Sequence, residues 1–160
     1  MFLSTISARS QRRNDQPSFP MSKVITEFLD IDTRGNTDVV DITRYCREVI
    51  KKSGLRKGVM TVFNPGSTGG ISTIEYEPNL IEDLRDSLEV FAPTDKPYAH
   101  SKTWHDDNGS SHIRSTIMGP SLSVPFDGAV PILGTWQQIV FCDFDTRPRT
   151  RRLVVQLIGE

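Results

Sequence analysis

The chain is poor in several features that would assign it to a familiar class of protein. Its 160 residues include only two cysteines, Cys46 and Cys142, too few for the disulfide framework of a small secreted domain. No run approaches the ~20 apolar residues of a membrane-spanning helix. Lysine and arginine number 19 against 20 acidic residues, so no basic surface for nucleic acid is indicated. These absences predict a soluble, cytoplasmic protein that binds neither membranes nor nucleic acid, with both thiols free and buried.

A complete phosphate-binding motif is also missing. The small, polar stretch Gly66–Gly70 resembles a phosphate-binding loop in composition, but it lacks the Gly-Lys-Ser/Thr ending of a Walker P-loop. Small residues still allow backbone N–H groups to approach an anion closely. A tight turn, or a strand packed where no side chain fits, explains the same composition. Both interpretations stay open.

Residues 1–20 differ in composition from the remainder of the chain. They contain several arginines and serines and show no usable hydrophobic period. A transit peptide explains them, and so does an overcalled start codon ahead of Met21. We expect disorder in this extension and assign one domain to residues 21–160, a normal length for a single hydrophobic core.

Hydrophobic periodicity predicts two helices and a series of strands. One helix begins after Asp41, a suitable N-cap, and ends before Gly54, which suits a left-handed C-cap. The second runs from Pro78 to Phe91. The beta-prone runs are Lys23–Ile31, Gly58–Phe63, Ile71–Tyr76, Ile113–Met118, Ser121–Phe126, Gln137–Cys142 and Leu153–Ile158. Because strands do not alternate regularly with helices, we expect an α+β domain in which two helices pack on a largely antiparallel or mixed sheet.

All three histidines lie in one polar stretch, Tyr98–His112. They are His100, His105 and His112, and two aspartates and Asn108 lie between the last two. This composition suits a divalent metal, zinc or magnesium, or a phosphorylated ligand. Simple solvated histidines are the alternative, because the spacing matches no fixed zinc signature.

Arginines gather near the C-terminus, at Arg147, Arg149, Arg151 and Arg152. Such a cluster is usually a solvated hairpin tip. It would instead supply bidentate recognition of phosphate if it folds near the histidines. We therefore place Asn108, Arg149 and Arg151 among the candidate phosphate-binding residues.

Several motifs in order along the chain together resemble the YjbQ-like family, often described as secondary thiamine-phosphate synthases. The motifs are His112-Ile113, Met118-Gly119-Pro120-Ser121, Val124-Pro125, Leu133-Gly134-Thr135-Trp136-Gln137 and Arg151-Arg152. The resemblance spans about Lys23 to Glu160. It implies a compact α+β fold, a homotrimer, and an enzyme that joins a pyrimidine diphosphate to a thiazole phosphate and releases pyrophosphate.

The resemblance also implies site residues. His100 and His112 match two histidines of the family, and Glu75 matches an acidic residue, so these three are the predicted catalytic set. The third family histidine opens a His-Thr-Thr/Ser-Ala motif, but here Gly66 occupies that position. From that motif only Ser67 and Thr68 carry over, as predicted phosphate-binding residues.

The missing histidine leaves two functions open. If His105 replaces it, His100, His105 and His112 would ligate a divalent metal, since three protein ligands and a water form a catalytic zinc site. The alternative is a non-catalytic trimer that binds a metal or a small phosphorylated molecule. In either case two helices are too few to cover the sheet, so we expect an uncovered face or edge that a subunit interface covers.

Overall fold

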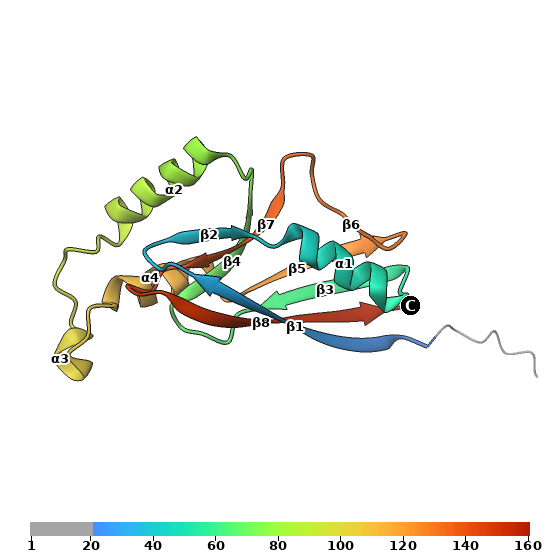
Figure 1. Cartoon of the computed structure of the whole chain (residues 1–160), viewed down its shortest axis with the longest axis horizontal. Coiled ribbons are helices and arrows are strands. Elements are labelled where there is room, and N and C mark those ends of the chain that lie inside the picture. The colour runs from blue at the N-terminus through green and yellow to red at the C-terminus, as the bar shows by residue number, and fades with distance from the viewer. Residues whose placement is uncertain (1–20) are drawn as a thin grey trace, which may run out of the picture.

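The structure is a computed structural model that describes residues 21–160, so the disorder predicted for residues 1–20 lies outside the described residues. Figure 1 shows the arrangement of strands and helices in this part of the chain. In order they are β1 (Lys23–Thr33), β2 (Asp38–Asp41), α1 (Thr43–Ser53), β3 (Lys57–Phe63), β4 (Gly69–Ile74), α2 (Pro78–Phe91), α3 (Ser101–Trp104), α4 (Gly109–Met118), β5 (Ser121–Asp127), β6 (Val130–Pro131), β7 (Gln138–Asp143) and β8 (Arg149–Gly159).

The strands form two antiparallel sheets. One has the order β1-β8-β3-β5-β6 and the other the order β2-β7-β4. The main core contains residues from both sheets and from α1, while a second cluster joins the three-stranded sheet to α2. Strand β8 shows why the sheets pack this way. Leu153, Val155 and Leu157 are fully buried, and the residues between them are more exposed, as alternation along a strand requires. The α+β prediction is confirmed.

Both predicted helices are present, with local signals at their ends as expected. The Asp41 carboxylate accepts a hydrogen bond from the Thr43 backbone N–H at 2.8 Å, and Gly54 ends α1 at a φ of 74°. Pro78 occupies the first turn of α2, where Glu77 accepts hydrogen bonds from two backbone N–H groups. Capping chemistry is therefore readable from sequence here.

The predicted strand at Ile113–Met118 is wrong, because these residues belong to helix α4. The buried face of α4 is polar and includes Ser111, Arg114 and Ser115. Ile113 and Ile117, whose β-branching suggested a strand, are 43% and 54% exposed. With the one-turn helix α3, α4 raises the helix count above the predicted two.

The outer face of the five-stranded sheet carries no helix in the part of the chain that the structure describes. Apolar residues on this face lie opposite one another on neighbouring strands. Val24 and Val59 both lie opposite Ile158, and Phe28 and Phe63 both lie opposite Val154. All of these except Val154 are exposed, Val24 by 64% and Phe28 by 56%. The uncovered sheet face expected from the sequence is present.

The two thiols are free and buried, as predicted. Burial raises the pKa of both Cys46 and Cys142 to about 12, so neither is a thiolate at neutral pH. Among residues 21–160, no helix is long and apolar enough to cross a membrane.

Candidate functional site

The loop between β3 and β4 is held by a buried asparagine. Asn64 accepts a hydrogen bond from the Gly66 N–H at 3.1 Å and donates to the carbonyls of Gly66 and Gly69 at 2.9 and 2.8 Å. Ser115 of α4 also donates to the Gly69 carbonyl, at 2.8 Å. Gly69 and Gly70 already belong to β4, and a Cβ at either would collide with Phe141 or Met118. Close packing therefore explains these two glycines, whereas in the loop Gly66–Thr68 only Ser67 is exposed and Thr68 is buried.

Two successive backbone N–H groups in this loop lack an acceptor. The N–H groups of Ser67 and Thr68 donate to no atom within residues 21–160. The Thr68 hydroxyl is occupied, because it donates to Asp145 at 3.1 Å. Successive free N–H groups form a concavity that favours an anion.

Arg151 lies beside this loop. Its Nε and Nη2 atoms donate to the two oxygens of Asp143 at 2.8 and 2.7 Å, and Nη2 also donates to Thr68 Oγ1 at 2.9 Å. The remaining nitrogen, Nη1, faces the glycine: a Cβ at residue 66 would lie only 3.2 Å from it. Because Gly66 has no side chain, Nη1 stays accessible from the loop.

Two aspartates at the end of β7 position Arg151 and Arg149. Asp143 is fully buried and also accepts hydrogen bonds from the Thr33 hydroxyl and the Asp145 N–H. Asp145 accepts from Arg149 Nε at 3.0 Å and from Arg151 Nη2 at 3.1 Å. We call Asp143, Asp145, Arg149 and Arg151 the aspartate–arginine cluster.

Charges within this cluster offset one another. Burial alone would raise the pKa of Asp145, but the hydrogen bond and charge of Arg149 outweigh it, so this pKa lies below its ordinary value. Burial would lower the pKa of Arg151, yet the hydrogen bonds and charges of Asp143 and Asp145 together outweigh it and the pKa is raised. Two carboxylates thus face two guanidinium groups, and an anion would be held by directed N–H groups more than by excess positive charge.

Sequence reasoning selected the two arginines but missed Asn64, Asp143 and Asp145. A signal for the aspartates was present. Asp143 and Asp145 are two apart at the end of one strand, and the arginines are two apart at the start of the next. Side chains two apart in extended chain point the same way, so the two pairs were candidates to meet.

His100 and His112 come together as predicted. Their ring centroids are 4.6 Å apart, and the ring planes are inclined by 59°. His100 Nε2 lies 3.4 Å from Asp106 Oδ2. Asn108, oriented with its amide nitrogen towards Asp106, donates to both carboxylate oxygens at 3.2 Å. We call His100 and His112 the histidine pair.

His105 does not complete a metal site with this pair. It is the exposed C-cap of α3, in a left-handed conformation with φ of 56°, while His100 is the N-cap of the same helix. Within the described residues, no three His, Cys, Asp or Glu side chains form a group that could hold a metal ion. The predicted set of His100, His105 and His112 is therefore not assembled by one chain.

Glu75 lies away from the other predicted catalytic residues. It follows the end of β4, whereas the loop with Ser67 and Thr68 precedes the start of that strand. An extended chain rises about 3.3 Å per residue, which separates Glu75 from Gly69 by roughly 20 Å. The sequence predicted Glu75 within a strand, Ile71–Tyr76, but β4 ends at Ile74 and Glu75 follows it, at the opposite end of the strand from the loop.

Phe144, the residue that follows β7, connects the loop to the helix of His112 through hydrogen bonds. The Phe144 N–H donates to the Thr68 carbonyl at 2.9 Å, and the Phe144 carbonyl accepts from the Ser111 hydroxyl at 2.6 Å. Ser111 precedes His112 on α4, so the histidine pair and the loop lie at the same end of β7. Arg152 is excluded from this region, since it lies on the outer sheet face and pairs with Asp30.

Known proteins resemble this chain along most of its length. The profile of the family described as UPF0047 protein YjbQ-like matches residues 27–160. A UPF0047 protein of Methanothermobacter thermautotrophicus is 36% identical over 138 residues, 86% of this chain and 94% of that protein. YugU of Bacillus subtilis is 34% identical over 134 residues, 82% of this chain and 97% of that protein. A YbjQ-like protein of unknown function from Sulfolobus solfataricus has a crystal structure that matches with a TM-score of 0.83 at 28% identity, covering 88% of this chain and 100% of that one.

Proposed function

The chain belongs to the UPF0047 family of YjbQ-like proteins, and from that premise we propose that it is an enzyme acting on a phosphorylated small molecule. The proposed reaction is of the thiamine-phosphate synthase type, in which a pyrimidine diphosphate is joined to a thiazole phosphate and pyrophosphate is released. The observation that carries the proposal is that Arg151 Nη1 lies beside Gly66, next in the chain to Ser67 and Thr68, whose N–H groups have no acceptor within residues 21–160. These three donors suit a phosphate oxygen.

Rigidity of this site supports a catalytic role. Asn64 holds the loop by three hydrogen bonds, and Asp143 holds the guanidinium of Arg151 by two. Donors that are fixed in advance stabilise the charge that develops on a departing diphosphate without a cost of reorganisation.

The histidine pair supplies the proton-transfer groups in this proposal. Imidazole titrates near neutral pH and is the side chain most often used for general acid–base catalysis. Asp106 lies beside His100 and orients its ring, and His112 is carried on α4 at the same end of β7 as the loop. No step is assigned to a metal ion, because no three His, Cys, Asp or Glu side chains among residues 21–160 form a group that could hold one.

A non-catalytic binding protein is the second candidate. It is favoured by the near neutrality of the aspartate–arginine cluster, in which Asp143 and Asp145 offset Arg149 and Arg151. A departing diphosphate carries several negative charges and benefits from excess positive charge, whereas a bound monophosphate is satisfied by directed N–H donors.

We further propose that three copies assemble through the outer face of the five-stranded sheet. Phe28, Val24 and Ile158 are exposed together on that face, and a monomer rarely exposes a contiguous apolar patch unless it is an interaction surface. Closed cyclic symmetry allows every copy to bury the same patch. In this proposal, the homotrimer that the sequence resemblance implies is held together by the outer faces of the five-stranded sheets.

Turnover of the two thiamine precursors by the purified protein tests the activity. We expect thiamine phosphate and pyrophosphate to form, and the Arg151→Lys and Gly66→Ala variants to lose activity, because lysine has no Nη1 donor and a Cβ at residue 66 would lie 3.2 Å from Nη1. Arg152→Lys, on the outer sheet face, is the matched control and retains activity. Calorimetric binding of pyrophosphate without turnover would select the binding protein, and the absence of both would exclude both candidates.

Sedimentation velocity tests the assembly. We expect a trimer for the parent chain and dissociation for Phe28→Asp, since an unpaired charge in an apolar interface is costly. Val90→Asp is the control, because Val90 is an apolar residue on α2 that is 88% exposed and lies outside the outer sheet face. Equal masses for both variants would show that another surface makes the contact.

A further inference from the structure

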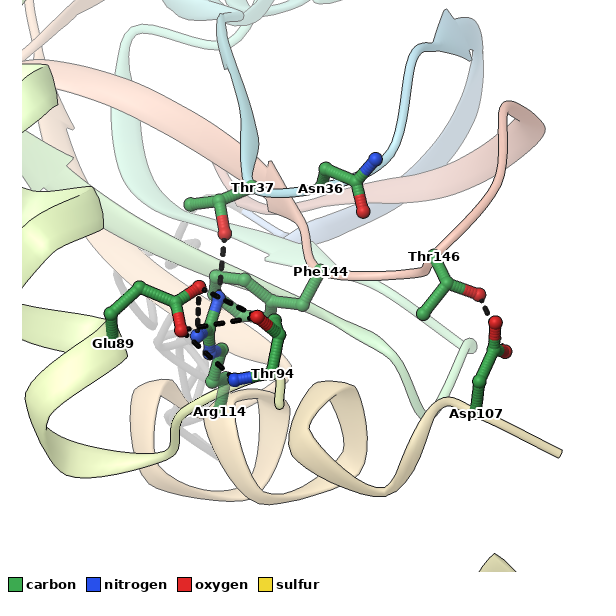
Figure 2. A pocket seen from close by; sticks show the side chains of 8 residues that line it. All are labelled: Asn36, Thr37, Glu89, Thr94, Asp107, Arg114, Phe144 and Thr146. Carbon is green, nitrogen blue, oxygen red and sulfur yellow. Dashed lines mark hydrogen bonds and ion pairs between the residues drawn. The ribbon is translucent and has the colours of Figure 1, made fainter. Parts of the chain in front are cut away.

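A cavity lies beside the end of β7, on the side opposite the aspartate–arginine cluster. Asp143 and Asp145 point towards Arg151, whereas Phe144 between them packs into the cluster next to α2. Figure 2 shows the cleft on the Phe144 side, between the turn that precedes β2 and helix α4. The cleft has a volume of about 420 Å³ and is lined by Asn36, Thr37, Glu89, Thr94, Asp107, Arg114, Phe144 and Thr146.

An ion pair between buried Arg114 and half-exposed Glu89 forms one wall of this cleft. Arg114 is only 3% exposed, and its Nη2 lies 2.7 Å from Glu89. Its other nitrogens donate to the Ala92 carbonyl at 3.0 Å and to Thr37 Oγ1 at 3.0 Å. Because Glu89 neutralises Arg114 inside the protein, the positive charge of Arg114 is not available to an anion in the cleft.

The opposite wall has an unusual backbone conformation. Gly35, Asn36 and Thr37 have consecutive positive φ angles of 76°, 50° and 62°. Positive φ is rare for a β-branched residue, and such conformations persist only where the surroundings enforce them, frequently at ligand sites. Arg85 and Arg114 enforce it here, by donating to the Thr37 carbonyl and hydroxyl. The strained turn presents the side chain of Asn36 at the cleft.

Two polar side chains at the cleft have unused bonding capacity: the Asn36 amide, which can donate and accept, and the Asp107 carboxylate, which accepts. Within residues 21–160 the Asn36 amide has no hydrogen-bond partner, and Figure 2 shows its oxygen on the cleft side. Asp107 is bonded only to the Thr146 hydroxyl, at 2.8 Å, and no cation pairs with it in the described part of the chain. With Glu89 and Arg114 offsetting each other, the lining therefore carries one uncompensated negative charge.

We propose that this cleft binds a small polyhydroxylated molecule that carries a protonated amine. The ammonium group pairs with Asp107, and the hydroxyls bond to Asn36, Thr94 and Thr37. A cavity of this volume accommodates a molecule the size of a monosaccharide. The site is separate from the loop Gly66–Thr68 and does not depend on the proposed synthase activity.

Three sugars distinguish the recognition of charge from the recognition of hydroxyls. Glucosamine carries the ammonium group, N-acetylglucosamine has it masked, and glucose lacks it. In amide-resolved NMR titrations of the full chain, we expect glucosamine at about millimolar concentration to shift the Asn36, Thr37 and Asp107 signals. The other two sugars produce smaller shifts. Equal shifts from all three, no shift from glucosamine, or shifts confined to the Gly66–Thr68 loop would each overturn the proposal.

Paired carboxylate variants locate the charge that is recognised. Asp107→Asn removes the charge but keeps an oxygen that accepts from Thr146, so we expect glucosamine affinity to fall about three- to fivefold, the range of a solvent-exposed ion pair. Asp95→Asn, on the same connecting segment but outside the cleft lining, leaves the affinity unchanged. Asn36→Ala weakens all three sugars alike. Unchanged affinity in Asp107→Asn would overturn the assignment of the ammonium group.

Discussion

The two halves of the candidate site differ in how firmly the fold holds them. In the aspartate–arginine cluster both carboxylates are buried and Arg149 is exposed, and each carboxylate accepts several hydrogen bonds from β1, β8 and the residues at the end of β7. The histidine pair stands in a segment of short helices, where His100 has only Asp106 and the ring of His112 as close partners. In the proposed function, one half is a fixed receptor for an anion, and the other is partly exposed to solvent and substrate.

This difference separates the roles of the two halves. A ligand phosphate must meet donors that are already in place, because ordering them on binding costs free energy. A proton-transfer group must instead exchange protons with water and approach the substrate, which partial exposure allows. Under this proposal the loop that binds and the segment that reacts are built by different means, and substitutions in each should affect different measurements.

Loss of a buried carboxylate should have the largest effect on stability. Asp143→Asn leaves Arg151 without its main ionic partner, and breaking a buried pair costs about 3–5 kcal/mol of unfolding free energy. Asp106→Asn, in the histidine half, should stay close to the parent protein. Denaturant unfolding of both variants measures the contrast, and a similar loss in each would contradict the distinction between a rigid and an exposed half.

Removing the asparagine that holds the loop should have the next largest effect. Asn64→Ala deletes three hydrogen bonds and leaves buried backbone groups unpaired, so we expect a loss of about 2–3 kcal/mol and weaker pyrophosphate binding. Asn108→Ala offers a matched amide in the other half and should change stability by less than about 0.5 kcal/mol. Intact pyrophosphate binding in Asn64→Ala would show that the loop needs no support.

Acid should weaken the fold through the aspartate–arginine cluster. The folded pKa of Asp145 lies below its ordinary value of 3.8, so its contribution to stability is complete above that value. The contribution is lost as pH falls through the lower, folded pKa. Measured between about pH 5 and pH 2, the unfolding free energy of Asp145→Asn should depend less steeply on pH than that of the parent. The same dependence of unfolding free energy on pH in the two proteins would show that Asp145 does not cause the loss of stability in acid.

The histidine pair should matter least for stability and most for turnover. His100→Gln and His112→Gln change partly exposed side chains, so unfolding free energy should shift by no more than about 0.5 kcal/mol. Turnover should fall by about 10²–10⁴, the usual contribution of general acid–base catalysis. His105→Gln is the control in the same segment and should match the parent in both assays. Unaltered turnover in both variants would show that neither His100 nor His112 transfers the proton.

Several features of the fold and of the site were predictable, because they depend on residues that are neighbours in the sequence. Capping at Asp41 and Gly54, burial of Cys46 and Cys142, and the clustering of histidines follow from local composition and period. The meeting of His100 and His112 was also anticipated, since both lie in one polar stretch. Helix α4 was not predictable in this way, because its buried face is polar and its isoleucines face solvent.

The sequence by itself determined the local elements and the types of residue available for chemistry, since helix caps and strand alternation act over a few residues. Only the tertiary structure decided which of them meet. Arg151 contacts Thr68 across 83 positions of the chain, and Glu75 is carried away from Thr68 by the length of β4 alone. Contacts of that kind depend on how whole strands pair and pack, which no window of neighbouring residues contains.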